Sequence, residues 1–229
     1  LAEVQQVQDW AAGLGGRTTA YIALSNVQIT PTRGFQLGRP QFTSSFFIDP
    51  QTYALVSDIR AVDPPDVPLR DLFTGGPEVV IGQNMADLND LHVGDEVFVS
   101  GTEQKYIVRG IVPTEAEASI NNVFASFFGF AYFDIRQAAA LGLSSLPNTI
   151  GIALKDGATP DDIEFAVDQL RQMIRFRDIN TSPWIIERNQ ELADMVGRFI
   201  VAMGLGALLI GGVGIMNTML VLVGRRTME

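Results

Sequence analysis

The stretch Glu78–Gly101 reads EVVIGQNMADLNDLHVGDEVFVSG. The apolar residues 79–81 predict a short buried strand over 78–82, and residues 84–88 predict a weak helix. Val93-Gly94-Asp95 predicts a turn into a strand at 96–100, and a further strand is predicted at 105–112. Short strands with one helix among them indicate a small β-barrel or sandwich within an α+β chain.

The residues before this stretch predict a helix followed by extended segments. Apolar residues recur at helical spacing over residues 1–11, and the glycines that follow end the helix. Residues 18–30 are rich in β-branched and aromatic side chains and predict a strand that ends at Pro31. A second extended stretch is expected over 35–48, and the prolines between 64 and 68 mark a loop.

Aromatic residues gather between residues 120 and 133. Phe130–Phe133 predicts a core strand, because burial is the usual place for such a run. Two interpretations stay open for Phe124, Phe127 and Phe128: they belong to the same core, or the glycine that follows them permits a loop that presents their rings to a partner, a substrate or a lipid surface.

The residues from 148 onward predict a βαβ unit. A strand is expected at 149–154, then a helix with Thr159 as its N-cap and Pro160 in its first turn. That helix carries a clear apolar stripe between residues 163 and 174. A strand from about Phe176 to Ile179 would complete the unit.

Phe199–Gly224 reads FIVAMGLGALLIGGVGIMNTMLVLVG, which is 26 residues without a charge. A helix of that length is about 39 Å long, against a hydrocarbon core of about 30 Å. The segment therefore predicts a transmembrane helix, and residues 185–198 predict an amphipathic helix that leads into it without a proline.

Small and polar residues in this segment predict close packing against other membrane helices, because they let helix backbones approach one another. They are Gly204, Gly206, Gly211, Gly212, Gly214 and Asn217. A nucleotide-binding interpretation of the glycines fails, since no strand precedes them and no Lys-Ser/Thr pair follows.

Composition excludes several classes of function. The net charge is −10 with only two lysines, which argues against nucleic acid as a partner. Cysteine is absent and His92 is the only histidine, so we expect no catalytic triad, no metal site and no cofactor. The first residues carry no signal-peptide pattern, and a chain that starts within a helix is expected to be a piece of a longer protein.

Three stretches resemble the periplasmic core domain and following transmembrane helix of MacB/FtsX-type ABC transporter permeases. The first is Glu78–Gly101 with the later YIVRGIV at 106–112, and the second is NTIGIALKDGATPDDIEFAVDQLRQMI at 148–174. The third and most specific is IGGVGIMNTMLVLVGRRTME at 210–229. The resemblance covers most of residues 50–229, whereas residues 1–50 match by pattern only.

The resemblance implies two extracytoplasmic subdomains. A porter-like α+β part would comprise residues 1–30 and 148–184, with a β-rich part at 31–147 inserted into it. A stalk helix at 185–198, the membrane helix at 199–224 and the start of a cytoplasmic segment at 225–229 would follow. The implied location is the inner membrane, with the bulk of the chain on the extracytoplasmic side.

The resemblance also implies a function and partners. The chain would be a non-catalytic permease subunit that relays ATP-driven motion to its outer domain, for export, lipoprotein release or mechanical signalling. Its partners would be a cytoplasmic ABC ATPase, a second permease protomer and an extracytoplasmic adaptor or substrate, in contact with membrane lipid. Arg225, Arg226 and Glu229 would lie at the end that couples to the ATPase. The alternatives are a membrane-anchored binding or adhesion module and an anchored hydrolase.

Overall fold

The computed structural model of the chain describes residues 2–33, 36–117, 123–174, 179, 181, 197–208 and 211–212. The chain divides into two compact units, Leu1–Thr181 and Ser182–Glu229, and each is described by itself.

The described part of the first unit is an α+β fold, as predicted. Its strands are β1 (Arg17–Arg33), β2 (Gln36–Leu37), β3 (Gln41–Ile48), β4 (Glu78–Gly82), β5 (Glu96–Val99), β6 (Lys105–Val112), β7 (Phe130–Asp134) and β8 (Thr149–Ala153). Its α-helices are α1 (Ala2–Gly13), α2 (Pro50–Tyr53), α3 (Gln83–Asn89), α4 (Val123–Phe128) and α5 (Pro160–Met173). Short 3-10 turns include Leu69–Leu72 and Thr114–Ala116.

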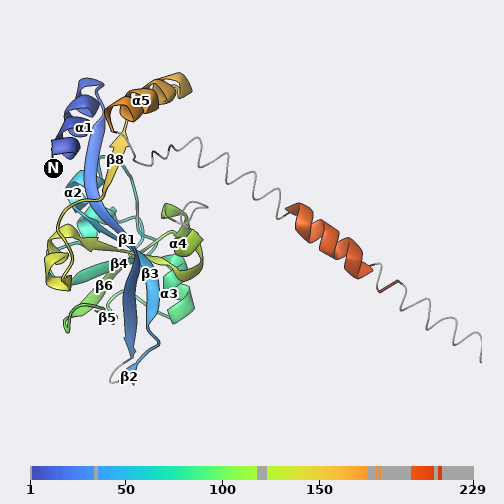
Figure 1. Ribbon diagram of the computed structural model, residues 1–229. Coiled ribbons are helices and arrows are strands. Elements are labelled where there is room, and N and C mark those ends of the chain that lie inside the picture. Colours follow the sequence, from blue (N-terminus) through green and yellow to red (C-terminus); the bar gives the residue numbers. More distant parts are fainter. Residues whose placement is uncertain are drawn as a thin grey trace, which may run out of the picture. The chain divides into compact units, whose positions relative to one another are not determined.

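Six strands close into a barrel, in the order β1-β3-β7-β4-β6-β5, because β5 pairs back onto β1 (Figure 1). The pairs β3–β7 and β4–β6 are parallel, and the other four pairs of the ring are antiparallel. Closure leaves this ring without an open edge strand, which is the part of a sheet most prone to unwanted pairing. Of the two architectures expected from the sequence, the barrel is confirmed.

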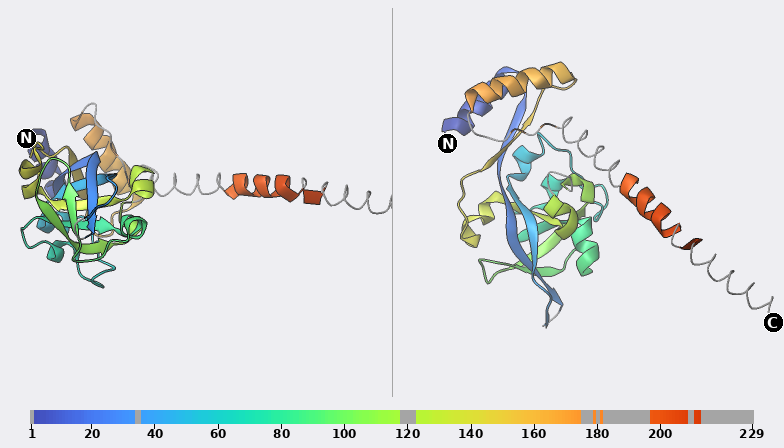
Figure 2. Two further views of the ribbon diagram at one scale, coloured as in Figure 1. Left: turned by 90° about the horizontal axis from the view of Figure 1, so that it is seen from below. Right: turned by 45° about the vertical axis from the view of Figure 1, so that its right-hand side comes forward.

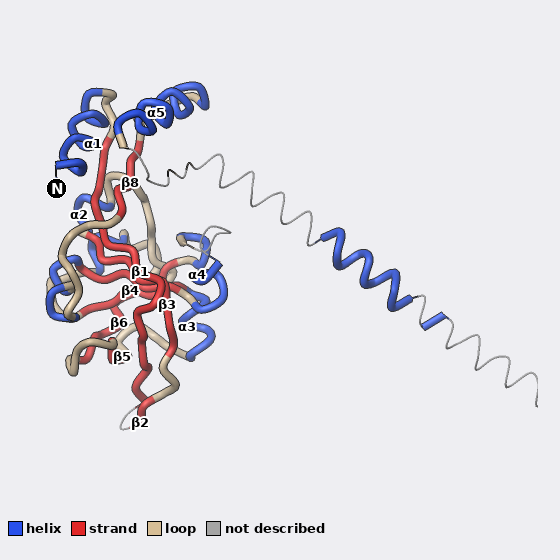
Figure 3. The backbone as a smooth tube through the Cα atoms, in the orientation of Figure 1, coloured by secondary structure: helices blue, strands red, loops and turns tan. Residues whose placement is uncertain are grey.

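The barrel has an apolar core inside and a second core against its outer wall. Alternate residues of each strand point to opposite faces, so Phe47 and Phe133 lie in the inner core with Tyr106 while Phe46 and Tyr132 lie in the outer one. The outer core is covered by α2, by α4 and by the segment between α2 and β4, which contributes Ala61, Leu69 and Leu72. Figure 3 shows α2 and α4 outside the red strands. The wall is therefore packed on both sides in this region.

An arm extends from the barrel along β1. Residues 22–31 of β1 belong to the barrel, whereas Arg17–Tyr21 pair with β8 in antiparallel register. The helices α1 and α5 lie side by side over this pair (Figure 2), where the indole Nε1 of Trp10 donates to the Oε1 of Gln169 at 2.7 Å. β1 is thus shared by both parts of the unit.

The capping predictions for α5 are confirmed in atomic detail. The Thr159 hydroxyl accepts from the backbone N–H of Asp162, and the Asp162 carboxylate accepts from the backbone N–H of Thr159, which is a capping box. Pro160 occupies the first turn, where its missing N–H is not needed.

Two local predictions are wrong. The first strand does not end at Pro31 but continues to Arg33, because proline lacks only a donor and the Pro31 carbonyl still accepts from the N–H of Gly38 at 2.8 Å. The loop interpretation of residues 124–128 is also wrong, since Val123–Phe128 form α4. Of the strand expected at 176–179 only Ile179 is described, and it is in no strand. Of the stalk helix expected at 185–198 only residues 197 and 198 are described, and both are α-helical.

In the second unit, residues 197–208 and 211–212 are α-helical. Large apolar side chains of this helix are exposed, among them Phe199, Ile200 and Leu208. Space is open around the glycines at 204, 206, 211 and 212, where an added Cβ would meet nothing within 4 Å. Within the described part of the chain, no helix is both long and apolar enough to cross a membrane. The rest of the predicted span, 209–210 and 213–224, lies outside the described residues.

Candidate functional site

Hydrogen bonds join α3 and α4 on the outside of the barrel. The Asn84 side-chain amide, at the start of α3, donates to the backbone oxygens of Ala125 at 2.8 Å and Ser126 at 3.2 Å. At the other end of α3, the Asn89 amide donates to the Oε1 of Gln41 at 2.9 Å. The two helices and the start of β3 are therefore held together, as Figure 1 shows on the right of the barrel.

Large apolar side chains of these three elements face solvent. The exposed fractions are 74% for Phe127 and 49% for Phe128 on α4, 60% for Leu88 on α3, and 51% for Phe42 on β3. Phe42 lies on the outer face of β3 because Thr43 and Ser45, which flank Ser44, point inward with Phe47. We call these four residues, Phe42, Leu88, Phe127 and Phe128, the aromatic surface.

The outer core contains a carboxylate held by two tyrosines. Oε1 of Glu117 accepts from the hydroxyl of Tyr53 at 2.9 Å and from that of Tyr132 at 2.5 Å. Burial raises the pKa of the Glu117 carboxyl, although these two hydrogen bonds act in the opposite direction. Burial, followed by the charge of Glu117, also raises the pKa of Tyr21 to about 12. Glu117 thereby attaches the chain after β6 to the barrel wall.

Glu117→Gln should change how stability depends on pH. Because the pKa of Glu117 is raised above 4.5, its contribution is full below pH 4.5 and is lost as pH rises through the folded-state pKa. Glutamine has no such titration, so the wild type should lose stability relative to this variant as the pH rises above about 4.5. Urea unfolding of the chain at a series of pH values measures the difference.

Glu115→Gln is the matched control for this prediction, because it makes the same change on an exposed side chain two residues away. A Glu117→Gln variant with the same pH dependence as the wild type would contradict the assignment of a raised pKa to Glu117.

Two other buried carboxylates are fully paired. Glu78 accepts from the N–H of Thr74 at 2.6 Å and from the Nε of Arg109 at 2.9 Å. Asp134 accepts from the backbone and guanidinium of Arg136. Burial disfavours the charged form at both sites, yet these hydrogen bonds lower the pKa of both carboxyls. Glu78 thus anchors the loop before β4, and Asp134 anchors the turn after β7.

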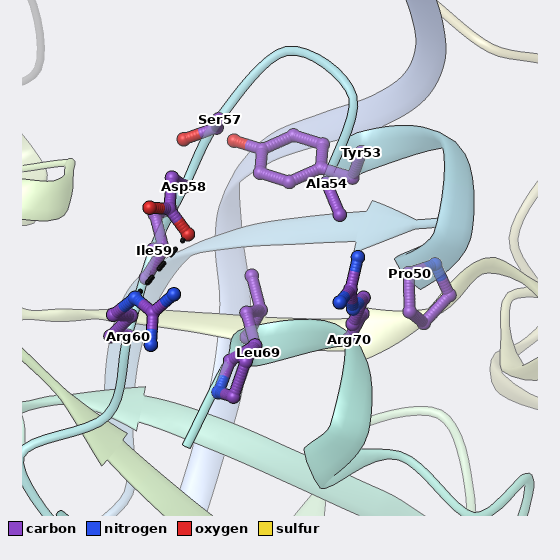
Figure 4. Close-up of a pocket in the computed structure, with 10 residues that line it drawn as sticks. Pro50, Tyr53, Ala54, Ser57, Asp58, Ile59, Arg60, Leu69 and Arg70 are labelled. Carbon is purple, nitrogen blue, oxygen red and sulfur yellow. Dashed lines mark ion pairs between the residues drawn. The ribbon is translucent and has the colours of Figure 1, made fainter. Parts of the chain in front are cut away.

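A hollow beside α2 is too small for a substrate. Its volume is about 60 Å³, and its lining includes Tyr53, Leu69 and Arg60, whose guanidinium pairs with Asp58 at 3.5 Å (Figure 4). Ligand sites of drug size measure roughly 300–1,000 Å³. A more open neighbouring hollow of about 320 Å³ has Asp49, Arg70 and Arg136 in its lining. Among the described residues, no group of three or more His, Cys, Asp or Glu side chains has a geometry that could hold a metal ion.

The residues singled out in the sequence fall in separate places. Phe127 and Phe128 lie on the aromatic surface, whereas the side chain of Phe124 lies outside the described part. Of the glycines predicted to pack against other membrane helices, those at 204, 206, 211 and 212 are described, and all four belong to the second unit. Outside the described residues lie Gly214, Asn217, Arg225, Arg226 and Glu229. His92 is exposed just before the turn at 93–94, with its backbone N–H bonded to Asp95.

Sequence reasoning missed Phe42 and Leu88. Phe42 is the second residue of β3, next to the inward-pointing polar residues Thr43 and Ser45. A polar–apolar alternation would therefore place Phe42 inside rather than outside. Leu88 sits in a helix of only seven residues, too short to show a periodic stripe. Neither residue could be assigned to the surface without the position of α4.

The described residues thus form a barrel with a helix-covered arm, and the feature that distinguishes its outside is an apolar contact surface. The first unit is thus a domain of the α+β class. The chain belongs to the family of MacB-like periplasmic core domains, whose family model matches residues 4–170.

Solved structures of transporter domains are similar to this chain. One is the extracellular domain of the noncanonical ABC-type transporter YknZ from Gram-positive bacteria, with 14% identity over 73% of this chain and 81% of that one and a TM-score of 0.46. Another is the periplasmic region of MacB from Actinobacillus actinomycetemcomitans, with 11% identity over 68% of this chain and 66% of that one and a TM-score of 0.45. No curated protein matches this chain.

Proposed function

We propose that this chain is the extracytoplasmic domain and one membrane helix of an ABC transporter permease, and that it is not itself an enzyme. The observation that carries the proposal is membership of the MacB-like periplasmic core domain family over residues 4–170. Support comes from the uncharged sequence of residues 199–224, which is long enough for a bilayer, and from the apolar exterior of the described helix at 197–208.

In this proposal the chain has the division expected from its sequence. Residues 1–30 and 148–184 form a porter-like part, and residues 31–147 form a β-rich part whose barrel also includes residues 22–30 of β1. Residues 185–198 form a stalk that joins the membrane helix. The glycines at 204, 206, 211, 212 and 214 and Asn217 pack against other spans of a permease dimer. Arg225, Arg226 and Glu229 lie on the cytoplasmic side, near the ATPase.

The outer domain then couples ATP hydrolysis in the cytoplasm to work outside the membrane, namely export, lipoprotein release or mechanical signalling. A stiff helix is one means of such coupling, and residues 184–224 contain no proline to interrupt it. The domain supplies contacts and movement, while a separate ATPase supplies the chemistry.

The test is purification of the full-length permease in mild detergent from its native membrane. We expect a P-loop ATPase to copurify, and the double variant Arg225→Ala with Arg226→Ala to reduce its yield several-fold. Arg171→Ala on α5 is the control, because Arg171 is an exposed arginine of the outer domain. If no ATPase copurifies with the wild type, the permease proposal is wrong and a membrane-anchored binding module takes its place.

A further inference from the structure

The charged residues of the segments that carry α3 and α4 are all acidic, whereas Arg39 lies exposed three residues before Phe42 on the β3 side. Residues 83–91 contain α3, and residues 113–128 contain Glu117 and end with α4. Together they contain Asp87, Asp90, Glu115 and Glu117 and not one lysine or arginine. Three of these carboxylates are exposed, since only Glu117 is in the outer core. Exposed apolar side chains are thus combined with negative charge on one side of the barrel.

This charge disfavours two occupants of the surface. A membrane leaflet rich in anionic lipid attracts basic segments and repels acidic ones. A second copy of the chain docked through the same surface would place carboxylates opposite carboxylates, which is destabilising at an interface. The remaining occupant is a partner of complementary charge. Its apolar side chains would contact the rings, and its positive charges would be attracted by the carboxylates.

The surface is also organised before any partner arrives. Asn84 fixes α4 to α3, and Gly129 brings the end of α4 against Met85. A rigid surface loses less conformational freedom on binding, so more of its contact energy appears as affinity. Aromatic side chains that become buried at the centre of an interface supply much of that energy.

We propose that the aromatic surface binds a protein segment that presents an apolar anchor flanked by lysine or arginine. Phe127 and Phe128 contact the anchor, and Asp87 and Glu115 attract the flanking cations. The inference rests on the extracytoplasmic placement in the proposed function and specifies the chemistry of an adaptor or substrate there.

The experiment places a photoreactive benzophenone amino acid at position 127 of the full-length permease in its native membrane. After irradiation, mass spectrometry identifies the peptide joined to position 127. We expect a segment with an apolar residue next to lysine or arginine, at a yield several-fold above that from position 165. Phe165 is the control site because it is 58% exposed on α5, away from the aromatic surface.

Lipid adducts alone, adducts to a second copy of the chain, adducts to acidic segments, or a yield equal to that at position 165 would each overturn the proposal. Copurification of the ATPase is measured on the same preparation. Retained ATPase with any of these outcomes removes the binding inference alone, whereas loss of the ATPase from the wild type removes the permease proposal.

Charge reversal provides a second measurement. Asp87→Lys together with Glu115→Lys, in the chain with the photoreactive residue at 127, should lower the crosslinking yield several-fold. Asp168→Lys on α5 should not, because it reverses an exposed carboxylate outside the aromatic surface. Equal yields from the two variants would contradict the role of charge, and matching thermal melts establish that both variants are folded.

Discussion

Phe133→Ala should be the most destabilising single truncation of the barrel. Phe133 is fully buried on β7, stacked on Phe47 at a centroid distance of 4.9 Å and edge-on to Tyr106 at 5.6 Å. Removing the ring loses the free energy gained by burying it and leaves a cavity that the surrounding strands cannot close. The expected loss in the free energy of unfolding is about 3–5 kcal/mol. Urea unfolding of the chain measures the loss.

Phe165→Ala is the matched control, because it removes the same ring from an exposed position on α5. Its expected cost is within about 0.5 kcal/mol. A loss below about 1 kcal/mol for Phe133→Ala would contradict the placement of Phe133 in the inner core of a closed barrel.

Gly129→Ala should both destabilise the chain and displace α4. Gly129 has φ +83°, in the left-handed region, and an added Cβ would lie 2.5 Å from the Cβ of Met85. The backbone conformation costs an alanine about 1–2 kcal/mol, and the overlap with a buried side chain adds about 1–3 kcal/mol. We therefore expect a total loss of about 2–5 kcal/mol in urea unfolding.

Gly157→Ala separates these two contributions. Gly157 has nearly the same φ, +81°, but an added Cβ there would meet nothing within 4 Å. This variant should show the conformational cost alone. Equal losses for the two variants would mean that α4 does not pack against Met85. In the photocrosslinking experiment, Gly129→Ala should lower the yield from position 127, and Gly157→Ala should not.

The strands of the barrel are largely predictable from sequence because short apolar runs are bounded by turn residues. Glu78–Gly82 precedes a helix, and Val93-Gly94-Asp95 separates that helix from the next strand. The capping box at Thr159 is also local chemistry. Each of these features depends on residues within about four positions of one another, which is the range over which sequence patterns carry structural information.

Ring closure and the aromatic surface are not predictable in this way. The barrel closes where Ile29 pairs with Val99, and no local pattern relates two segments so far apart. The surface requires α3, α4 and β3 to meet, and the Asn84 and Asn89 side chains that join them look like ordinary polar residues in the sequence. Glu117 likewise resembles a solvent-exposed acid until Tyr53 and Tyr132 are placed beside it.

The sharing of β1 between barrel and arm affects how the protein is made. Residues 22–29 of β1 find β3 soon after synthesis, but Arg17–Tyr21 wait for β8, whose first residue, Thr149, is 128 positions after Tyr21. At about 5–20 residues per second, ribosomes need about 6–26 s to reach it. Throughout that interval Arg17–Tyr21 remain an unpaired strand edge while the barrel strands β3 to β7 are being made, so this is where a chaperone has most to protect.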